Sequence, residues 1–212
     1  PAILLGLMLP VSIPLKVFIA VAILPHVTAL IAVILAVVVK WVVMGRVEEG
    51  VVERPTLLWK VRLLIAHRMT ESGEMGVSWF GGTSIVGVVY RLLGAQVGER
   101  CFLSGLTVGA GVELIEIGDD CWFGSLVMAR PVEQLADGSV RFRRVRIGNA
   151  VLVAERVLLE GGCEVKDGVT LGSLTYVEKG TELEVGGICV GSPAIAIRTR
   201  RGGGVGGGLL GV

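Results

Sequence analysis

Five arginines lie close together in one short stretch, and they are the residues of this chain best suited to hold an anion. They fall within the segment RPVEQLADGSVRFRRVR and are Arg130, Arg141, Arg143, Arg144 and Arg146. A planar guanidinium group donates paired hydrogen bonds that match the oxygens of a phosphate. We therefore expect a phosphate or substrate to bind here, with acidic lipid as the alternative ligand because another basic segment follows an apolar stretch nearer the amino terminus.

The other residue types that commonly carry chemistry are few. The four cysteines have no metal-binding or redox spacing, and Cys101, Cys121 and Cys163 each occupy the same position of a regular repeat, where a small buried residue is expected. The two histidines, His26 and His67, both precede that repeat. A β-helical zinc enzyme of the carbonic anhydrase type needs three histidine ligands, so that function is excluded and no metal is expected.

The regular repeat is the element that must position any site. From Ile147 to Ile188 the chain reads in sixes as IGNAVL, VAERVL, LEGGCE, VKDGVT, LGSLTY, VEKGTE and LEVGGI, and the first residue of each is aliphatic. A helix with 3.6 residues per turn cannot keep such residues on one face. A parallel β-helix can, because three short strands close one coil and the aliphatic residues of successive coils stack inside.

The same register extends upstream with interruptions. Hexads begin at Val97, Leu103, Ile117 and Phe123, and the spacing from Leu103 to Ile117 predicts a bulged coil. Between Ala129 and Ile147 the pattern lapses into the arginine-rich segment with its Asp-Gly turn signal, which predicts a loop extending from a corner of the coil. Loops on a rigid repeat scaffold often carry function, although a solvated insertion without a role fits the same residues.

The amino-terminal half is apolar. The mean hydropathy of the chain is +0.75, and residues 17–39 contain no charge and are flanked by Lys16 and Lys40. Such a run predicts a membrane span, which Pro25 should kink or break. The chain begins with Pro1 and an apolar stretch, and we expect it to be part of a longer protein. A cleaved signal peptide is the rival interpretation, but no basic start or cleavage site is visible.

A basic segment follows the apolar run and predicts the orientation. The cations after the run are Lys40, Arg46, Arg54, Lys60, Arg62 and Arg68, and only Lys16 precedes it. The positive-inside bias places the β-helix on the cytoplasmic side of a membrane. Residues 55–69 alternate apolar and cationic side chains at helical spacing, which suits a helix in the lipid headgroup layer or one packed on the end of the β-helix. The net charge of +1 indicates no nucleic-acid partner.

The predicted fold is a left-handed parallel β-helix of hexapeptide repeats preceded by transmembrane and amphipathic helices. The expected parts are transmembrane helical segments at 1–44, a juxtamembrane basic and amphipathic region at 45–90, the β-helix at 91–195 with an inserted loop at 130–146, and a basic, then Gly-rich tail at 196–212. The composition GGGVGGGLLGV at the end of that tail cannot bury a core and predicts disorder.

Two groups of residues carry a family resemblance. The hexads and the closing segment Val190-Gly191-Ser192-Pro193-Ala194 resemble the hexapeptide-repeat acyltransferase superfamily, whose left-handed β-helix often ends in G-x-P-A. The segments KWVVMGR (40–46), PTLLW (55–59) and YRLLGAQVG (90–98) are similar to the membrane-bound carboxy-terminal region of ε-poly-L-lysine-synthetase-like proteins, which are related to non-ribosomal peptide synthetases. The resemblance covers roughly residues 27–200, and none of these segments is a catalytic motif.

The resemblance implies an activity, a donor and partners. It implies transfer of an acyl or aminoacyl group from a phosphopantetheine carrier or CoA to an amine, with no tightly bound cofactor. It also implies a homotrimer, or a pseudo-trimer with sister β-helical domains, in contact with membrane lipid. Such transfer needs a base, usually a histidine in the loop before the R-I-G hexad, but that loop has none here. Glu133 and Asp137 are the weak candidates to replace it.

Two functions therefore remain open. The chain is an acyl- or aminoacyltransferase module of a larger membrane synthetase, or it is a catalytically inactive β-helical scaffold for oligomerisation or product transport. Membership of the resembled family favours the enzyme, and the missing histidine favours the scaffold.

Overall fold

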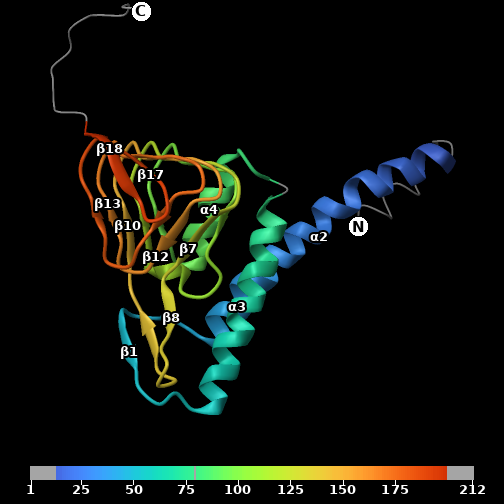
Figure 1. Cartoon of the computed structure of the whole chain (residues 1–212). Helices are drawn as coiled ribbons and strands as arrows, with labels where there is room; N and C mark the ends of the chain where they lie inside the picture. Colours follow the sequence, from blue (N-terminus) through green and yellow to red (C-terminus); the bar gives the residue numbers. More distant parts are fainter. Residues whose placement is uncertain (1–12, 79, 200–212) are drawn as a thin grey trace, which may run out of the picture.

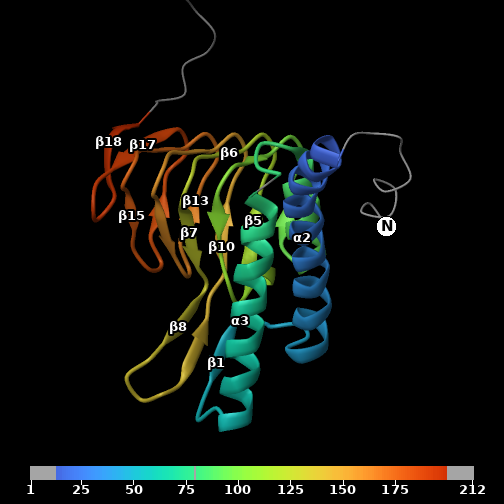
Figure 2. The same ribbon diagram turned by 90° about the vertical axis from the view of Figure 1, so that its right-hand side faces the viewer.

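The predicted β-helix is the largest part of the computed structural model, which describes residues 13–78 and 80–199. Short strands stack into three parallel sheets (Figures 1 and 2). The first sheet contains β2 (Gln96–Val97), β5 (Ile115–Ile117), β10 (Val145–Ile147), β13 (Glu164–Val165) and β16 (Glu182–Leu183). The second contains β3 (Phe102–Leu103), β6 (Trp122–Phe123), β11 (Leu152–Val153), β14 (Thr170–Leu171) and β17 (Gly187–Val190). The third contains β4 (Leu106–Thr107), β7 (Val127–Arg130), β12 (Leu158–Glu160) and β15 (Tyr176–Val177).

The core of the solenoid follows the hexad register. Val165 is 1% exposed and pairs in register with Ile147 on one side and Leu183 on the other. The aliphatic first residues of all seven hexads are buried. The fifth residues of the first five hexads, from Val151 to Thr175, are buried as well. The expected left-handed β-helix of hexapeptide repeats is therefore confirmed, and its core is a stack of aliphatic side chains supplied by one coil after another.

The irregular spacing between Leu103 and Ile117 has a structural counterpart. After β4 the chain forms a short 3₁₀ helix, η1 (Val112–Leu114), before it enters β5. The extra residues of the predicted bulge lie in this turn and the segment before it. As a result, the backbone from Val108 to Ala110 leaves the regular ladder of the third sheet and faces the helices.

The arginine-rich segment is a β-hairpin rather than an open loop. Its strands are β8 (Val132–Gln134) and β9 (Val140–Phe142), and β1 (Gly50–Val52) pairs antiparallel with β9 to complete a three-stranded sheet. Gly138 supplies the positive φ of the turn. The hairpin extends below the coils in Figure 2. The strand that completes it comes from far upstream in the sequence, which is why local pattern alone predicted a loop.

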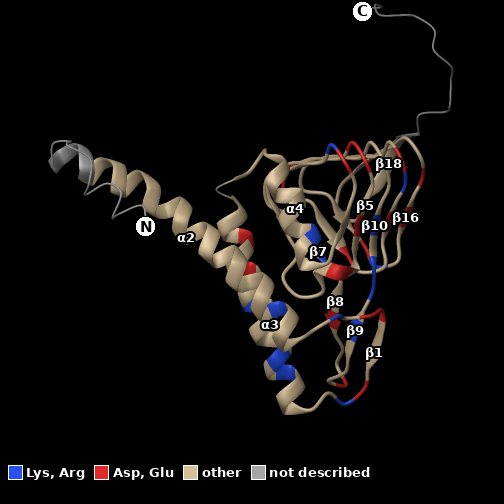
Figure 3. Ribbon diagram, turned by 180° about the vertical axis from the view of Figure 1, so that it is seen from behind, with Lys and Arg blue, Asp and Glu red and all other residues tan. Residues whose placement is uncertain are grey.

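Two long helices lie side by side beside the solenoid. α2 (Ile13–Val43) continues through Pro25 without a break, and Thr28 donates to the carbonyl of Leu24 at 3.0 Å. α3 (Leu57–Ser78) runs antiparallel to it. By length and composition Val17–Val43 could cross a membrane, a criterion that buried core helices and signal sequences also meet. α2 carries no charged residue between Lys16 and Lys40, and the described part of it that projects beyond α3 is tan in Figure 3.

Small residues allow α2 and α3 to approach closely. A Cβ atom added to Gly73 would lie 2.6 Å from the Cβ of Ala36, and one added to Gly76 would lie 2.8 Å from the carbonyl oxygen of Ala29. Only glycine fits at these two positions. Packing of this kind, with glycine facing alanine, is typical of helices that associate within or beside a bilayer.

The two ends of the solenoid are capped differently. α4 (Ser84–Leu93) covers the first coil with Val86, Val89, Tyr90 and Leu93, all of them buried. At the other end β18 (Ile195–Thr199) pairs antiparallel with β17. The tail was expected to begin at residue 196, and β18 instead continues through residues 196–199. The stretches expected to be a preceding apolar segment and a disordered Gly-rich tail lie almost wholly outside the described residues.

Candidate functional site

The structure distributes the five arginines over different surfaces. Arg144 and Arg146 both contact Glu116, the latter with Nε at 3.3 Å, and Arg144 also pairs with Glu49 at 3.5 Å. Arg130 lies at the end of β7 and pairs with Glu160 at 3.9 Å. Arg141 lies opposite Glu133 in the hairpin, and the side chain of Arg143 packs over Gly161 and Gly162. Several of the guanidinium groups are thus neutralised by carboxylates, and the expected single anion site remains a prediction.

The two carboxylates proposed as bases are in surroundings that stabilise their charged forms. Glu133 accepts a hydrogen bond from Lys179 at 2.5 Å, and this bond together with the positive charge of Lys179 holds the pKa of Glu133 below its usual value. Asp137 accepts hydrogen bonds from the hydroxyl and backbone N–H of Ser139 in the hairpin turn, which lower its pKa as well. A lowered pKa makes a carboxylate a poorer proton acceptor.

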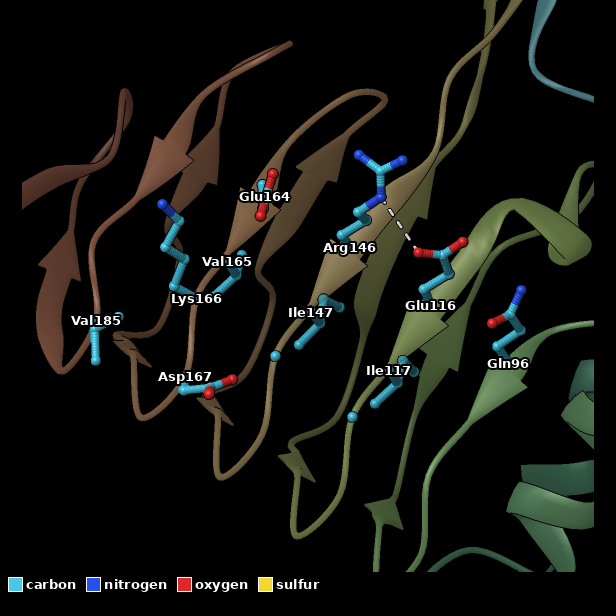
Figure 4. Close-up of a pocket in the computed structure, with 12 residues that line it drawn as sticks. Gln96, Glu116, Ile117, Arg146, Ile147, Glu164, Val165, Lys166, Asp167 and Val185 are labelled. Carbon is cyan, nitrogen blue, oxygen red and sulfur yellow. Dashed lines mark hydrogen bonds and ion pairs between the residues drawn. The ribbon is translucent and has the colours of Figure 1, made fainter.

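A groove of about 410 Å³ crosses the outer face of the first sheet, and we call it the ladder groove (Figure 4). Its wall is a column of side chains from successive strands, in the order Gln96, Glu116, Arg146, Glu164. Lys166 and Asp167 complete its charged lining. The lining therefore holds three carboxylates (Glu116, Glu164 and Asp167) against two cations (Arg146 and Lys166), and its charge suits a cationic group better than a phosphate.

The ladder groove was not predicted from the sequence, although the hexad register identifies several of the residues that line it. The residue before each aliphatic position points outward, and positions three hexads apart fall on the same sheet. That rule selects Arg146, Glu164 and Glu182 directly from the printed hexads.

His67 lies closer to the solenoid than the sequence suggested. Its Nδ1 accepts the backbone N–H of Ala110 at 3.1 Å, and its Nε2 lies 3.3 Å from a carboxylate oxygen of Glu71. Both ring nitrogens therefore have a partner, one in the first coil and one on α3. Because neither nitrogen then offers a free lone pair, His67 is placed to join α3 to the first coil rather than to act as a base.

Glu74 makes a second connection between the same elements. One of its oxygens accepts the backbone N–H groups of Val108 at 2.9 Å and Gly109 at 3.2 Å. Burial raises the pKa of Glu74 to about 7, despite those two hydrogen bonds. Together with His67, it provides acceptors for three successive N–H groups that the bulged coil leaves without ladder partners.

Residues of the family-like segments form the third connection. Lys40 pairs with Glu113 of η1 at 3.3 Å, and both side chains are at most 5% exposed. Trp41 donates from Nε1 to the carbonyl of Leu92 at 2.9 Å, and Glu113 also accepts the N–H of Val47 at 2.7 Å. In the sequence, Lys40 is the first of the cations that follow the apolar run and predict its orientation. The structure instead uses this charge to attach α2 to the solenoid.

The cysteines are ordinary core residues. Burial raises the pKa of the Cys121 thiol to about 11 and that of Cys163 to about 12. Cys101 is only half-buried, and its thiol donates to the carbonyl of Gly118 at 3.0 Å. Within the described residues, no group of three or more His, Cys, Asp or Glu side chains could hold a metal ion.

The sequence of this chain is similar to that of a distant relative. No family model matches the chain. It is 25% identical over 162 residues to delta-poly-L-ornithine synthetase of Acinetobacter baumannii (strain AB307-0294). The matched region is 74% of this chain but only 12% of that protein, so the chain spans a small part of its relative.

Solved structures of two acetyltransferases are similar to this chain. A maltose O-acetyltransferase from Clostridium difficile 630 aligns at 17% identity with a TM-score of 0.43, covering 64% of this chain and 89% of that one. A galactoside acetyltransferase in complex with coenzyme A aligns at 16% identity with a TM-score of 0.45, covering 72% and 88%. The coil topology and the hexad register show a β-helix of hexapeptide repeats, and its distant relative is a poly-amino-acid synthetase.

Proposed function

We propose that this chain is an acyltransferase-like module of a larger membrane synthetase, in which it receives an amine acceptor without supplying the catalytic base. The group transferred is acyl or aminoacyl, and its donor is a carrier phosphopantetheine thioester or CoA. The observation that carries the proposal is the ladder groove, whose excess of carboxylates faces outward on the first sheet. An aliphatic amine is protonated at neutral pH, so such a groove raises its local concentration before the proton is removed.

The surroundings of the candidate bases support the proposal that this chain does not supply the catalytic base. Glu133 and Asp137 have lowered pKa values, and both nitrogens of His67 are engaged. Neither histidine of the chain belongs to the β-helix. We infer that the base comes from a neighbouring β-helical domain, which meets this one in a trimer or a pseudo-trimer.

The relation to a membrane extends the proposal. We infer that α2 crosses the bilayer and that the β-helix lies on the cytoplasmic side, because cations follow the apolar run. From Val17 to Thr28 the side chains of α2 are exposed, apart from the half-buried Ile19 and Pro25, whereas Ala29 and Ala36 pack on α3. Protease added to sealed inside-out vesicles should digest the β-helix, and protease added to right-side-out vesicles should leave it intact. The reverse pattern would place the β-helix on the other side.

The function is tested in the whole membrane-embedded synthetase with a cationic amine acceptor. Glu164→Gln should raise the KM for that acceptor at least threefold and leave kcat unchanged, and added salt should reduce the difference. Glu178→Gln, at an exposed turn outside the groove, is the matched control. Equal KM values for the two variants would show that the ladder groove does not bind the acceptor.

A second pair of variants tests the base. Glu133→Gln and Asp137→Asn should each keep kcat within about twofold of the parent, since we propose that the base lies in another domain. A large fall in kcat with either variant would show that this chain performs the proton transfer itself.

The inactive scaffold remains the second candidate, and the outer face of the second sheet favours it. Phe102 and Trp122 stack there with ring centroids 5.9 Å apart, and Leu152 follows on the next strand. All three are about 40% exposed. Such an apolar ladder suits docking of a sister β-helix. Under this reading Glu164→Gln leaves KM unchanged, whereas Trp122→Glu disrupts assembly.

A further inference from the structure

A second groove lies between α3 and the hairpin, and the proposed transfer reaction makes no use of it. Its volume is about 440 Å³, within the range of ~300–1,000 Å³ usual for small-molecule sites. We call it the helix–hairpin groove. α3 forms one wall, the hairpin forms the other, and the bulged segment after β4 forms the floor.

The lining of this groove is apolar inside and cationic at its edge. Apolar side chains come from all three walls, among them Leu63, Val108, Pro131 and Leu135. Lys60 and Arg130 are the cations of the lining, one from each side. His67 also lines it, but its two ring nitrogens are engaged by Ala110 and Glu71.

The two cations have spare capacity for an anion. Lys60 is exposed and makes no ion pair within the described part of the chain. Arg130 has a half-exposed side chain, and its ion pair, to Glu160, is long at 3.9 Å. No carboxylate lines the groove. The ladder groove, by contrast, has more carboxylates than cations, so the two grooves select charges of opposite sign.

The groove also continues onto an exposed apolar surface. Leu64 both lines the groove and is 55% exposed. It belongs to a stripe on the outer face of α3 that includes Leu57, Val61 and Ile65, all at least 40% exposed. The packing of α3 on α2 and on the solenoid leaves this stripe uncovered. An amphiphile held on this stripe can therefore extend its acyl chain into the groove without crossing water.

We propose that the helix–hairpin groove binds one acyl chain that carries an anionic head group. The chain lies along Leu63, Val108 and Leu135, and the head group is held between Lys60 and Arg130. A fatty acid carboxylate and the phosphate of an anionic lipid share this chemistry. This site is independent of the proposed transfer reaction, because it uses none of the residues that form the ladder groove.

The test uses the purified chain in detergent micelles with three photoactivatable probes: a diazirine palmitate, a diazirine phosphatidylglycerol and a diazirine phosphatidylcholine. Mass spectrometry locates the labelled peptides. Palmitate, phosphatidylglycerol or both should label residues 60–67 and 131–140, at least tenfold more strongly than phosphatidylcholine does. The anionic probe that labels these peptides shows whether the ligand is a fatty acid or an anionic phospholipid. Inorganic phosphate should not displace either, because the acyl chain supplies most of the binding.

Two double variants decide the outcome. Lys60→Gln with Arg130→Gln should reduce labelling by the anionic probes at least tenfold. Arg62→Gln with Arg156→Gln removes the same charge from exposed positions outside the groove and should leave labelling unchanged. Circular dichroism should show that both variants keep the fold. Equal labelling of the two variants, equal labelling by all three lipids on the outer face of α2, or displacement by phosphate alone would each overturn the proposal.

Discussion

The coils from residue 145 to residue 190 and the helical half with its hairpin are held together in different ways. Each coil contacts its neighbours through ladder hydrogen bonds and a stack of aliphatic side chains such as Ile147, Val165 and Leu183. The helices are attached to the first coils through side chains with charge or hydrogen-bonding groups, among them Lys40, Glu113 and Glu74. A repeat can be stabilised by the same contact many times, whereas a unique junction needs specific partners.

The difference has an energetic consequence. Stacks of aliphatic side chains stabilise the fold in proportion to the apolar area that they bury, and this stabilisation does not depend on pH. A buried charge can stabilise the fold only when its partner is present. If the partner is removed, the unpaired charge lowers the free energy of unfolding substantially. We therefore expect the solenoid to be insensitive to pH and the helix junction to be sensitive to both pH and single charge deletions. The following variants test this contrast, from the largest effect to the smallest.

Val165→Asp should cause the largest loss. It buries a carboxylate among aliphatic side chains, so the free energy of unfolding should fall by more than about 4 kcal/mol. Urea unfolding in detergent micelles, followed by circular dichroism, measures this. Leu152→Asp is the control, because Leu152 points outward on β11 and is 41% exposed. Similar midpoints for the two variants would contradict the register.

Glu113→Ala should detach the helices from the solenoid. It leaves Lys40 buried without a partner, at a cost of about 3–5 kcal/mol. The double variant Lys40→Met with Glu113→Leu replaces the pair by apolar groups and should recover most of the loss. Limited proteolysis near residue 47, where the backbone N–H bonds to Glu113, reports the detachment. If the double variant is as easily cleaved as Glu113→Ala, the buried charge is not the cause.

Glu74 should make the junction sensitive to pH. Its pKa is raised to about 7 from an ordinary value near 4.5. Between those two pH values the folded state keeps a proton that the unfolded state releases. The free energy of unfolding therefore falls as pH rises from about 4.5 to 7, by about 3 kcal/mol in all. Glu74→Gln should remove this slope in unfolding measurements at a series of pH values, and an unchanged slope would rule out Glu74 as its source.

Gly73→Ala should have the smallest of these effects. The added Cβ meets the Cβ of Ala36 at 2.6 Å, so α2 and α3 must separate slightly, at a cost of about 1–3 kcal/mol. Thermal unfolding in micelles measures the loss. Ser72→Ala, on the exposed side of the same helix, should change the melting temperature little. A melting temperature for Gly73→Ala as high as that for Ser72→Ala would mean that the helices are not closely packed.

The solenoid could be predicted in detail because its information is periodic. Ile147 and the first residue of each later hexad are assigned to the core by register alone, and the same register assigns Arg146 and Glu164 to an outer face. The hairpin could not be assigned in this way, because β9 takes its partner β1 from residues 50–52, some ninety positions upstream. Pairing over such a separation leaves no periodic pattern in either segment.

The candidate sites show the same contrast between what the sequence predicts and what only the folded structure determines. The sequence by itself determined which residue types were present: arginines grouped before the R-I-G hexad, no histidine in the β-helix, and a long uncharged stretch near the amino terminus. Only the tertiary structure decided that Arg146 contacts Glu116, that Lys40 is buried with Glu113, and that His67 reaches the first coil. The reason is physical. Burial and charge pairing depend on which surfaces meet, and these surfaces come from distant segments brought together by folding.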